Sequence, residues 1–122
     1  MIVYLSARYE RAEEMRILRA RLREIPRTEV RSHWLDEKPH ALPVACAFVD
    51  RADIRSSDVL VAFTEEPGVW SRGGRHVEFG IAWEAGKRLW VVGPEENIFH
   101  TMAHERFADA EQMLVHVRGL HL

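Results

Sequence analysis

The segment from residue 73 to residue 87 (GGRHVEFGIAWEAGK) contains the side chain best placed to do chemistry. Two glycines precede a helix start, and Glu78 follows one turn into that helix. The apolar stretch after Glu78 must pack against a sheet, so its carboxylate is expected at the mouth of a cleft. A helix N-terminus favours the ionised form, which suits a nucleophile or a base. The alternative, which the spacing alone favours, is an ordinary first-turn glutamate that complements the helix dipole.

A second acidic group lies in residues 48–63 (FVDRADIRSSDVLVAF). Asp50 and Asp53 are three residues apart and therefore share one face of the predicted helix. Asp58 begins the next strand, at the end of the sheet away from a ligand, and is predicted to be structural, as a cap or in a turn. Asp50 is either a solvated helix charge or an acid that faces the cleft.

The first predicted strand leads directly into a helix through residues 3–10 (VYLSARYE). Backbone N–H groups, the Ser6 hydroxyl and the Arg8 guanidinium at such a turn suit a phosphate or a sugar hydroxyl. Tyr9 belongs to the same turn. A routine strand-to-helix connection is the alternative interpretation.

Apolar strand-like runs alternate with helical patterns along the chain. Such alternation predicts an α/β fold with a parallel sheet and helices on both faces. Ligands of such sheets bind beyond the carboxyl ends of the strands. The predicted strands cover residues 2–6, 29–34, 58–64, 88–92 and a minimal edge near 106–107. The predicted helices cover residues 10–24 (with Met15, Leu18 and Leu22 as the apolar stripe), 45–56, 75–86 (ended by Gly86), 97–104 and a last helix capped by Asp109. The carboxyl-terminal ends of the strands, where a ligand is expected, are residues 6–9, 34–36, 64–74 and 93–97.

Composition excludes several classes of function. The chain has 122 residues, 47% of them apolar, and a net charge of −2, so it fits one domain with a real core. Acids and bases are interspersed without a basic stripe, which argues against a nucleic-acid polymer as partner. No apolar run is long enough for a membrane span, and the single Cys46 is predicted to be a buried apolar residue. A soluble, cytoplasmic protein is expected.

Common cofactor and metal motifs are missing. The sequence has no Walker or dinucleotide loop and no G-x-S-x-G elbow. His100 and His104 are four apart, but Thr101 stands where a zinc peptidase needs glutamate. We therefore expect neither a metal nor an organic cofactor.

Taken together, these motifs resemble the nucleoside 2-deoxyribosyltransferase family and its relatives, the 2′-deoxynucleoside 5′-monophosphate N-glycosidases. The resemblance covers nearly the whole chain: I-V-Y-L-S, then D-x7-D-V-L-V-A, then V-E-F-G-I-A-x-x-x-G-K-x-L-W-V-V, of which E-x-G-x-A-x-x-x-x-K is the most specific part. It implies a single flavodoxin-like (Rossmann-like) three-layer domain over residues 1–122, with about five parallel strands in the order 2-1-3-4-5. It also implies a homodimer or a larger homo-oligomer.

The resemblance assigns roles to individual residues. Glu78 would attack the anomeric carbon, and Asp50, eight residues before Asp58, would protonate the departing base. Tyr4, Ser6 and Arg8 would line the sugar or 5′-phosphate pocket. A neighbouring subunit would contribute residues from 97–102, with His100 and Thr101 favoured.

Departures from the family pattern point to the substrate. Arg72 replaces an aspartate that helps transferases to bind the base, and Gly74, Arg75 and His76 replace smaller residues. Together with Arg8, these side chains favour an anionic substrate. The prediction is an N-glycosidase acting on a nucleoside 5′-monophosphate or nucleoside; the alternatives are a deoxyribosyltransferase and a non-catalytic nucleotide sensor.

Aromatic side chains have two predicted uses. Trp34, Trp70 or Phe79 could stack on the base, with core or dimer packing as the alternative. Trp83, Trp90 and the apolar side of helix 97–104 are predicted as dimer surfaces.

Overall fold

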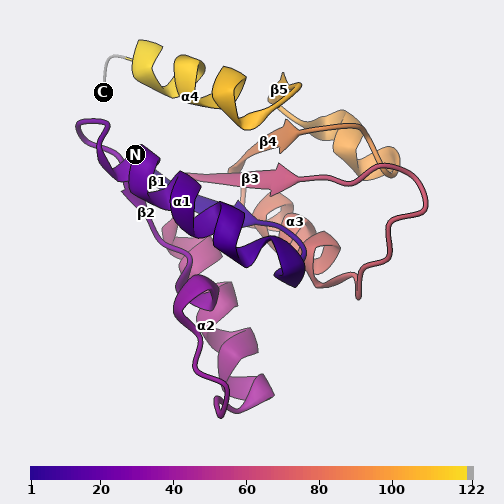
Figure 1. Ribbon diagram of the computed structural model, residues 1–122. Helices are drawn as coiled ribbons and strands as arrows, with labels where there is room; N and C mark the ends of the chain where they lie inside the picture. The colour runs from indigo at the N-terminus through magenta and orange to yellow at the C-terminus, as the bar shows by residue number, and fades with distance from the viewer. Residues whose placement is uncertain (121–122) are drawn as a thin grey trace.

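The computed structural model describes residues 1–120 and contains one five-stranded parallel sheet (Figure 1). The strand order β2-β1-β3-β4-β5 confirms the order that the family resemblance implies. The strands are β1 (Ile2–Ser6), β2 (Glu29–Val30), β3 (Val59–Phe63), β4 (Arg88–Val92) and β5 (Glu105–Phe107). β1 and β3 are hydrogen-bonded neighbours at the centre, in the register Val3 to Val59.

Helices cover both faces of the sheet, as the alternation predicts. The helices are α1 (Ala12–Arg23), α2 (Pro43–Ser56), α3 (Gly74–Glu84) and α4 (Ala110–Gly119), with 3-10 turns η1 (Tyr9–Arg11), η2 (His33–Asp36) and η3 (Ile98–Met102). An ion pair between Arg21 and Glu111 joins α1 to α4. α2 packs against α3 in the other layer. The fold therefore has three layers.

The core lies between the sheet and its helices. Every residue of β3 is buried, as expected for a strand covered on both faces. Met15, Leu18 and Leu22 form the buried stripe of α1, which confirms the predicted amphipathic pattern. Each such side chain contributes about 1.5–3 kcal/mol when fully buried.

The second strand is much shorter than the predicted range of 29–34. The Arg31 N–H still donates to the Val3 carbonyl at 2.8 Å, but the next ladder position is taken by a side chain. The Leu5 N–H donates to Ser32 Oγ at 2.8 Å, and the chain then turns into η2. A serine oxygen thus substitutes for a backbone carbonyl and ends the strand early.

Several structural predictions are confirmed. Asp58 Oδ2 accepts the Ile2 N–H at 2.7 Å, which ties β1 to the start of β3. Asp109 caps α4 by accepting the Gln112 N–H at 2.9 Å. Gly86 ends α3 with a positive φ of 73°, a conformation that favours glycine.

Other predictions need correction. Cys46 is partly exposed, because the N-terminal half of α2 extends beyond the body of the molecule (Figure 1). Trp90 is fully buried against Phe107 and His116, so it offers no dimer surface. Residues 97–104 form only the short η3. No helix in residues 1–120 has the length and hydrophobicity needed to span a bilayer.

Candidate active site

A cavity of about 680 Å³ opens at the carboxyl-terminal edge of β1 and β3. Its walls come from the turn after β1, the segment after β2, α2, and the loop leading into α3. The lining residues are Ala7, Arg8, Tyr9, Glu10, Trp34, Glu37, Ala47, Asp50, Arg51, Ser71, Arg72, Gly73, Gly74, Arg75, Val77, Glu78 and Ile81. The predicted ligand-side ends of the first three strands therefore meet at one place, whereas residues 93–97 do not line this cavity.

Glu78 lies in the first turn and a half of α3, and two side chains of β1 hold its carboxylate. The Tyr4 hydroxyl donates to one carboxylate oxygen, and Ser6 Oγ donates to the other at 2.8 Å. Burial raises the pKa of Glu78 to about 7, against the opposing effect of the two hydroxyl donors. The sequence predicts that the helix N-terminus favours the ionised form of this carboxylate, but burial acts in the opposite direction and is the largest effect on its pKa.

Tyr4 and Ser6 are fully buried and do not line the cavity. Burial and the neighbouring Glu78 charge raise the pKa of Tyr4, so its hydroxyl stays protonated and remains a donor. The structure places both residues behind Glu78, which corrects the expectation that they line the sugar or phosphate pocket. They fix the position of the carboxylate.

Asp50 reaches the same cavity from α2. Its Oδ1 atom is buried and has no hydrogen-bond partner among the described residues. Burial, followed by the charges of Glu37 and Asp53, raises the pKa of Asp50 to about 6, and His33 acts in the opposite direction. A carboxyl group with this pKa can carry a proton near neutral pH and donate it.

Three arginines bring positive charge to the cavity. Arg8 Nε forms a 3.4 Å ion pair with Glu10 Oε2, and this buried atom has no hydrogen-bond partner in residues 1–120. Arg72 lies over the Trp70 ring at 5.6 Å. Within the described part of the chain, neither Arg51 nor Arg72 has a carboxylate partner. These guanidinium groups can bind an anionic ligand.

Arg75 and His76 do not act as the sequence suggests. Arg75 is buried, and its guanidinium is bound by Glu96, with Nη2 2.6 Å from Oε2. Glu96 also accepts the Glu65 N–H at 2.9 Å. His76 lies outside the cavity, 3.4 Å from the Asn97 side chain, and burial lowers its pKa. Glu96 thus neutralises Arg75 and fixes the loop after β3, a role that no sequence motif indicated.

The structure places His100 in the interior and Thr101 on the surface. His100 is 1% exposed, its Nδ1 accepts the Glu96 N–H at 3.0 Å, and its ring packs edge-on against Phe79. A side chain buried in this way is not presented to a neighbouring subunit, so that expectation is wrong for His100. Thr101 is exposed, donates to the Ile98 carbonyl at 2.6 Å, and does not line the cavity.

Of the aromatic candidates, only Trp34 lines the cavity. Trp70 is exposed on the loop after β3, and Phe79 is buried against His100. Tyr9, 69% exposed, stands at the opening, and Gly74 forms part of the wall.

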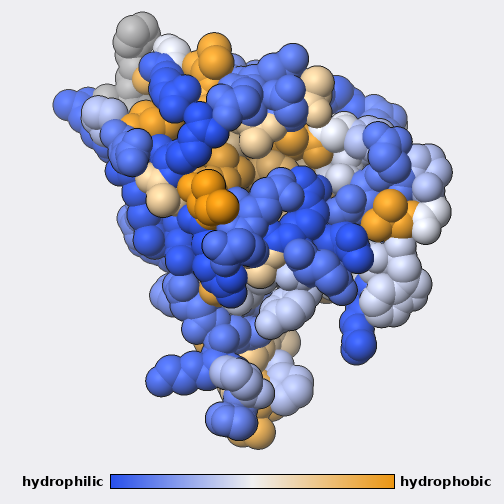
Figure 2. All heavy atoms as spheres, in the orientation of Figure 1, coloured by the Kyte–Doolittle hydropathy of each residue, from blue (hydrophilic) through white to orange (hydrophobic). Residues whose placement is uncertain are grey.

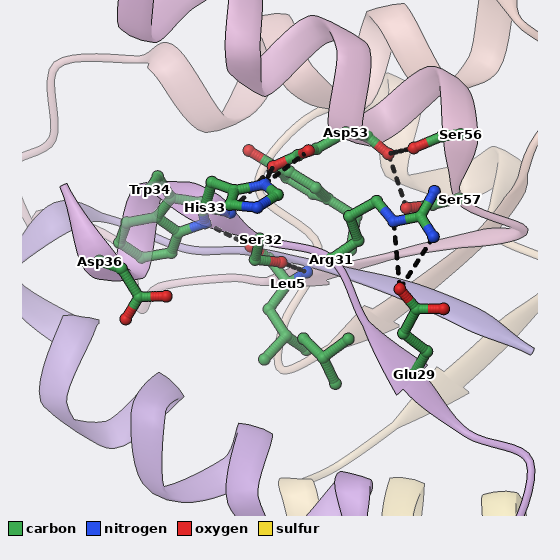
Figure 3. A network of polar contacts seen from close by, with 12 residues as sticks. Leu5, Glu29, Arg31, Ser32, His33, Trp34, Asp36, Asp53, Ser56 and Ser57 are labelled. Carbon is green, nitrogen blue, oxygen red and sulfur yellow. Dashed lines mark hydrogen bonds and ion pairs between the residues drawn. The ribbon is translucent and has the colours of Figure 1, made fainter.

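The wall that carries Trp34 is fixed by polar contacts to two elements (Figure 3). Trp34 Nε1 donates to the Leu5 carbonyl at 2.8 Å. The His33 N–H and ring Nδ1 both contact Asp53 of α2, each at 2.8 Å from Oδ2. Asp53 is 5% exposed, so the predicted helix aspartate next to Asp50 is a structural anchor.

Two cavity residues have no sequence signal that would have found them. Glu37 lies in the connection between η2 and α2, and Arg51 follows Asp50 in α2. Neither belongs to a recognisable motif, and only the tertiary structure brings them to the site. Residues 1–120 contain no cluster of three potential metal ligands.

The architecture and site define an α/β protein with a carboxylate-containing cavity at the carboxyl edge of its sheet. No family model and no curated protein matches the sequence. Solved structures do match. The chain is 24% identical to a CMP N-glycosidase of Clostridium botulinum, with a TM-score of 0.68 over 96% of this chain and 98% of the other.

Two further structures share the fold. A conserved protein of Enterococcus faecalis is 13% identical, with a TM-score of 0.77 and 97% of each chain covered. A 2-deoxyribosyltransferase of Bacillus psychrosaccharolyticus is 18% identical, with a TM-score of 0.71 over 93% of this chain and 90% of the other. The chain therefore has the fold of the nucleoside 2-deoxyribosyltransferase-like proteins.

Proposed function

We propose that this protein cleaves the N-glycosidic bond of a nucleoside 5′-monophosphate or nucleoside, using Glu78 as nucleophile. The observation that carries the proposal is the placement of Glu78: two buried hydroxyl donors hold its carboxylate in the wall of a nucleotide-sized cavity, which also contains Asp50. The shared fold with an N-glycosidase and a deoxyribosyltransferase supports the same reaction class.

The proposed mechanism parallels retaining glycoside hydrolysis. A Glu78 oxygen attacks C1′ as the C1′–N bond breaks, and Asp50 gives a proton to the departing base. A water molecule then gives a proton to the Asp50 carboxylate as its oxygen attacks C1′, which releases the Glu78 carboxylate and yields the free sugar. A second base in place of water would give transfer. Tyr4 and Ser6 position the nucleophile throughout.

The two carboxyl groups must share one proton for this reaction. Burial raises the pKa of Asp50 to about 6 and that of Glu78 to about 7, so both carboxyl groups titrate near neutral pH. We expect a bell-shaped pH profile for base release, with its maximum between the two pKa values.

The positive charges support a phosphorylated substrate. Arg8, Arg51 and Arg72 line the cavity, and the latter two have no carboxylate partner in the described chain. Guanidinium groups bind phosphate oxygens through paired hydrogen bonds. We therefore propose a nucleoside 5′-monophosphate over the free nucleoside.

The test is release of free base from ribo- and deoxyribonucleoside 5′-monophosphates, followed by chromatography. We expect release by the wild type, none by Glu78→Gln, and a loss of about 10²- to 10⁴-fold in Asp50→Asn. Glu66→Gln, an exposed carboxylate outside the cavity, is the matched control. Release that persists in Glu78→Gln would contradict the mechanism; binding without release by the wild type would favour a nucleotide sensor.

We also propose that a second copy of the chain covers the exposed side of α2. Leu42, which directly precedes α2, and Val44 and Phe48 within it are 68%, 62% and 63% exposed, and this helix extends from the body. Figure 2 shows mainly hydrophilic residues over this face of the molecule, with some hydrophobic residues at the lower tip, where α2 lies. An exposed apolar patch of this kind marks an interaction site. A second apolar surface is formed by Trp83 of α3 and Phe99 of η3. Both side chains are half exposed, and their ring centroids are 6.3 Å apart.

Light scattering with size-exclusion chromatography tests the dimer. Val44→Glu should shift the protein towards monomer, because it puts a charge into the proposed contact. Val115→Glu is the matched control, since this valine of α4 is 65% exposed in the other helix layer. A wild-type protein that is monomeric at high concentration would overturn this proposal.

A further inference from the structure

We propose that Glu37 selects substrates whose base carries an exocyclic amino group, such as cytosine or adenine, over bases with a carbonyl oxygen in its place. The inference rests on the proposed N-glycosidase function and concerns the base-binding side of the same cavity.

Glu37 lies at the end of a rigid segment of the cavity wall. It directly follows η2, and its N–H donates to the Trp34 carbonyl at 3.4 Å. The segment is held to β1 through Ser32 and Trp34 and to α2 through His33, as Figure 3 shows. Trp34 and Glu37 both line the cavity, so an apolar indole and a carboxylate lie on one preorganised wall.

Contacts with α2 place Glu37 near the proposed general acid. Glu37 lies close enough to Cys46 of α2 to raise the pKa of its thiol. Cys46 and Asp50 are four residues apart on α2 and therefore share one face of the helix. Glu37 is also the charged residue with the largest effect on the pKa of Asp50. Because Asp50 protonates the departing base in the proposed reaction, Glu37 lies on the side where the base binds.

The chemistry of a carboxylate then decides which base fits. Within the described chain, Glu37 has no cation partner. An ionised carboxylate only accepts hydrogen bonds, so an amino group can donate to it. A carbonyl oxygen at the same position would face the carboxylate without a proton between them. A lost hydrogen bond to a charged group corresponds to about a 10- to 100-fold preference.

Two matched pairs of substrates test the inference, because each pair differs only by an amino group and a carbonyl oxygen: cytidine and uridine 5′-monophosphate, and adenosine and inosine 5′-monophosphate. We expect kcat/KM of the wild type to favour the amino member of at least one pair by about 10-fold or more. Glu37→Gln should reduce that ratio to within about threefold, because an amide can donate as well as accept. Glu66→Gln should keep the wild-type ratio.

The ratio separates recognition from a general effect on the site. Removal of the Glu37 charge lowers the pKa of both Asp50 and Glu78, which shifts the pH profile to lower pH for every substrate alike. Only a direct contact with the base changes the ratio within a pair. Circular dichroism and thermal unfolding establish that Glu37→Gln is folded.

The outcomes distinguish this inference from the proposed function. If the wild type releases base without preference in either pair, or if Glu37→Gln keeps the preference, the inference is overturned while the N-glycosidase proposal stands. If no base is released, that proposal fails, and calorimetric binding of the same nucleotides decides: a preference in Kd that Glu37→Gln abolishes supports the inference. Equal binding, or none, overturns it.

Discussion

Burial of the Glu78 carboxyl predicts that replacing it stabilises the protein at high pH. The pKa of this group is 4.5 without the protein environment and about 7 in the fold. The folded state therefore holds the proton more tightly, and wild-type stability falls as the pH rises from the lower value through the higher one. At about 1.4 kcal/mol for each unit of pKa, the full loss is about 3 kcal/mol.

Glu78→Gln removes this penalty but also weakens the contacts below the side chain. The neutral amide retains an acceptor for one of the Tyr4 and Ser6 hydroxyls, at a cost of about 1 kcal/mol for the hydrogen bond that is lost or weakened. We expect the variant to be about 2 kcal/mol more stable than the wild type at pH 9 and no more stable at pH 5.

Urea unfolding at intervals between pH 5 and pH 9 measures the effect as the difference in free energy of unfolding between variant and wild type. Glu66→Gln, which removes an exposed carboxylate, should show no such trend. A difference for Glu78→Gln that stays constant across this range would refute the argument, because the carboxyl would then titrate alike in the folded and unfolded chains.

Two further perturbations probe the elements around the site. Gly93→Ala should destabilise the fold by about 2–4 kcal/mol, since the residue has a φ of 111° and an added Cβ would lie 2.5 Å from Thr64 Oγ1. Gly80→Ala is the control, because this glycine lies in a helix with open space around it, and the change should be neutral or stabilising by up to about 1 kcal/mol. Equal melting temperatures for Gly93→Ala and Gly80→Ala would contradict the steric argument. Asp53→Asn should cost about 1–3 kcal/mol in urea unfolding, because the buried carboxylate that binds the His33 backbone and ring is replaced by an amide; a change below about 0.5 kcal/mol would show that this anchor is unimportant.

The sequence by itself determined which elements are buried and where the proposed nucleophile lies, whereas the strand order was implied by the family resemblance. Apolar strands and amphipathic helices are local patterns, so the β3 run and the buried stripe of α1 predicted their own burial. The E-x-G-x-A-x-x-x-x-K pattern placed Glu78 early in a helix after a glycine-rich loop, and the structure has it there.

Contacts between distant segments decided the rest. The charge state of Glu78 depends on burial and on hydroxyls more than 70 residues away, with sequence separations of 74 for Tyr4 and 72 for Ser6. Arg75 looked like an anion-binding cation, but Glu96, 21 residues further on, neutralises it.

The position of Glu37 could not be predicted from the sequence either, because its segment has no pattern of its own. It lines the cavity because Trp34 binds to β1 and His33 binds to α2. The physical reason is that local patterning sets which residues are buried along an element. Desolvation and ion pairing depend on which elements meet in space, and these effects set the chemistry of the site.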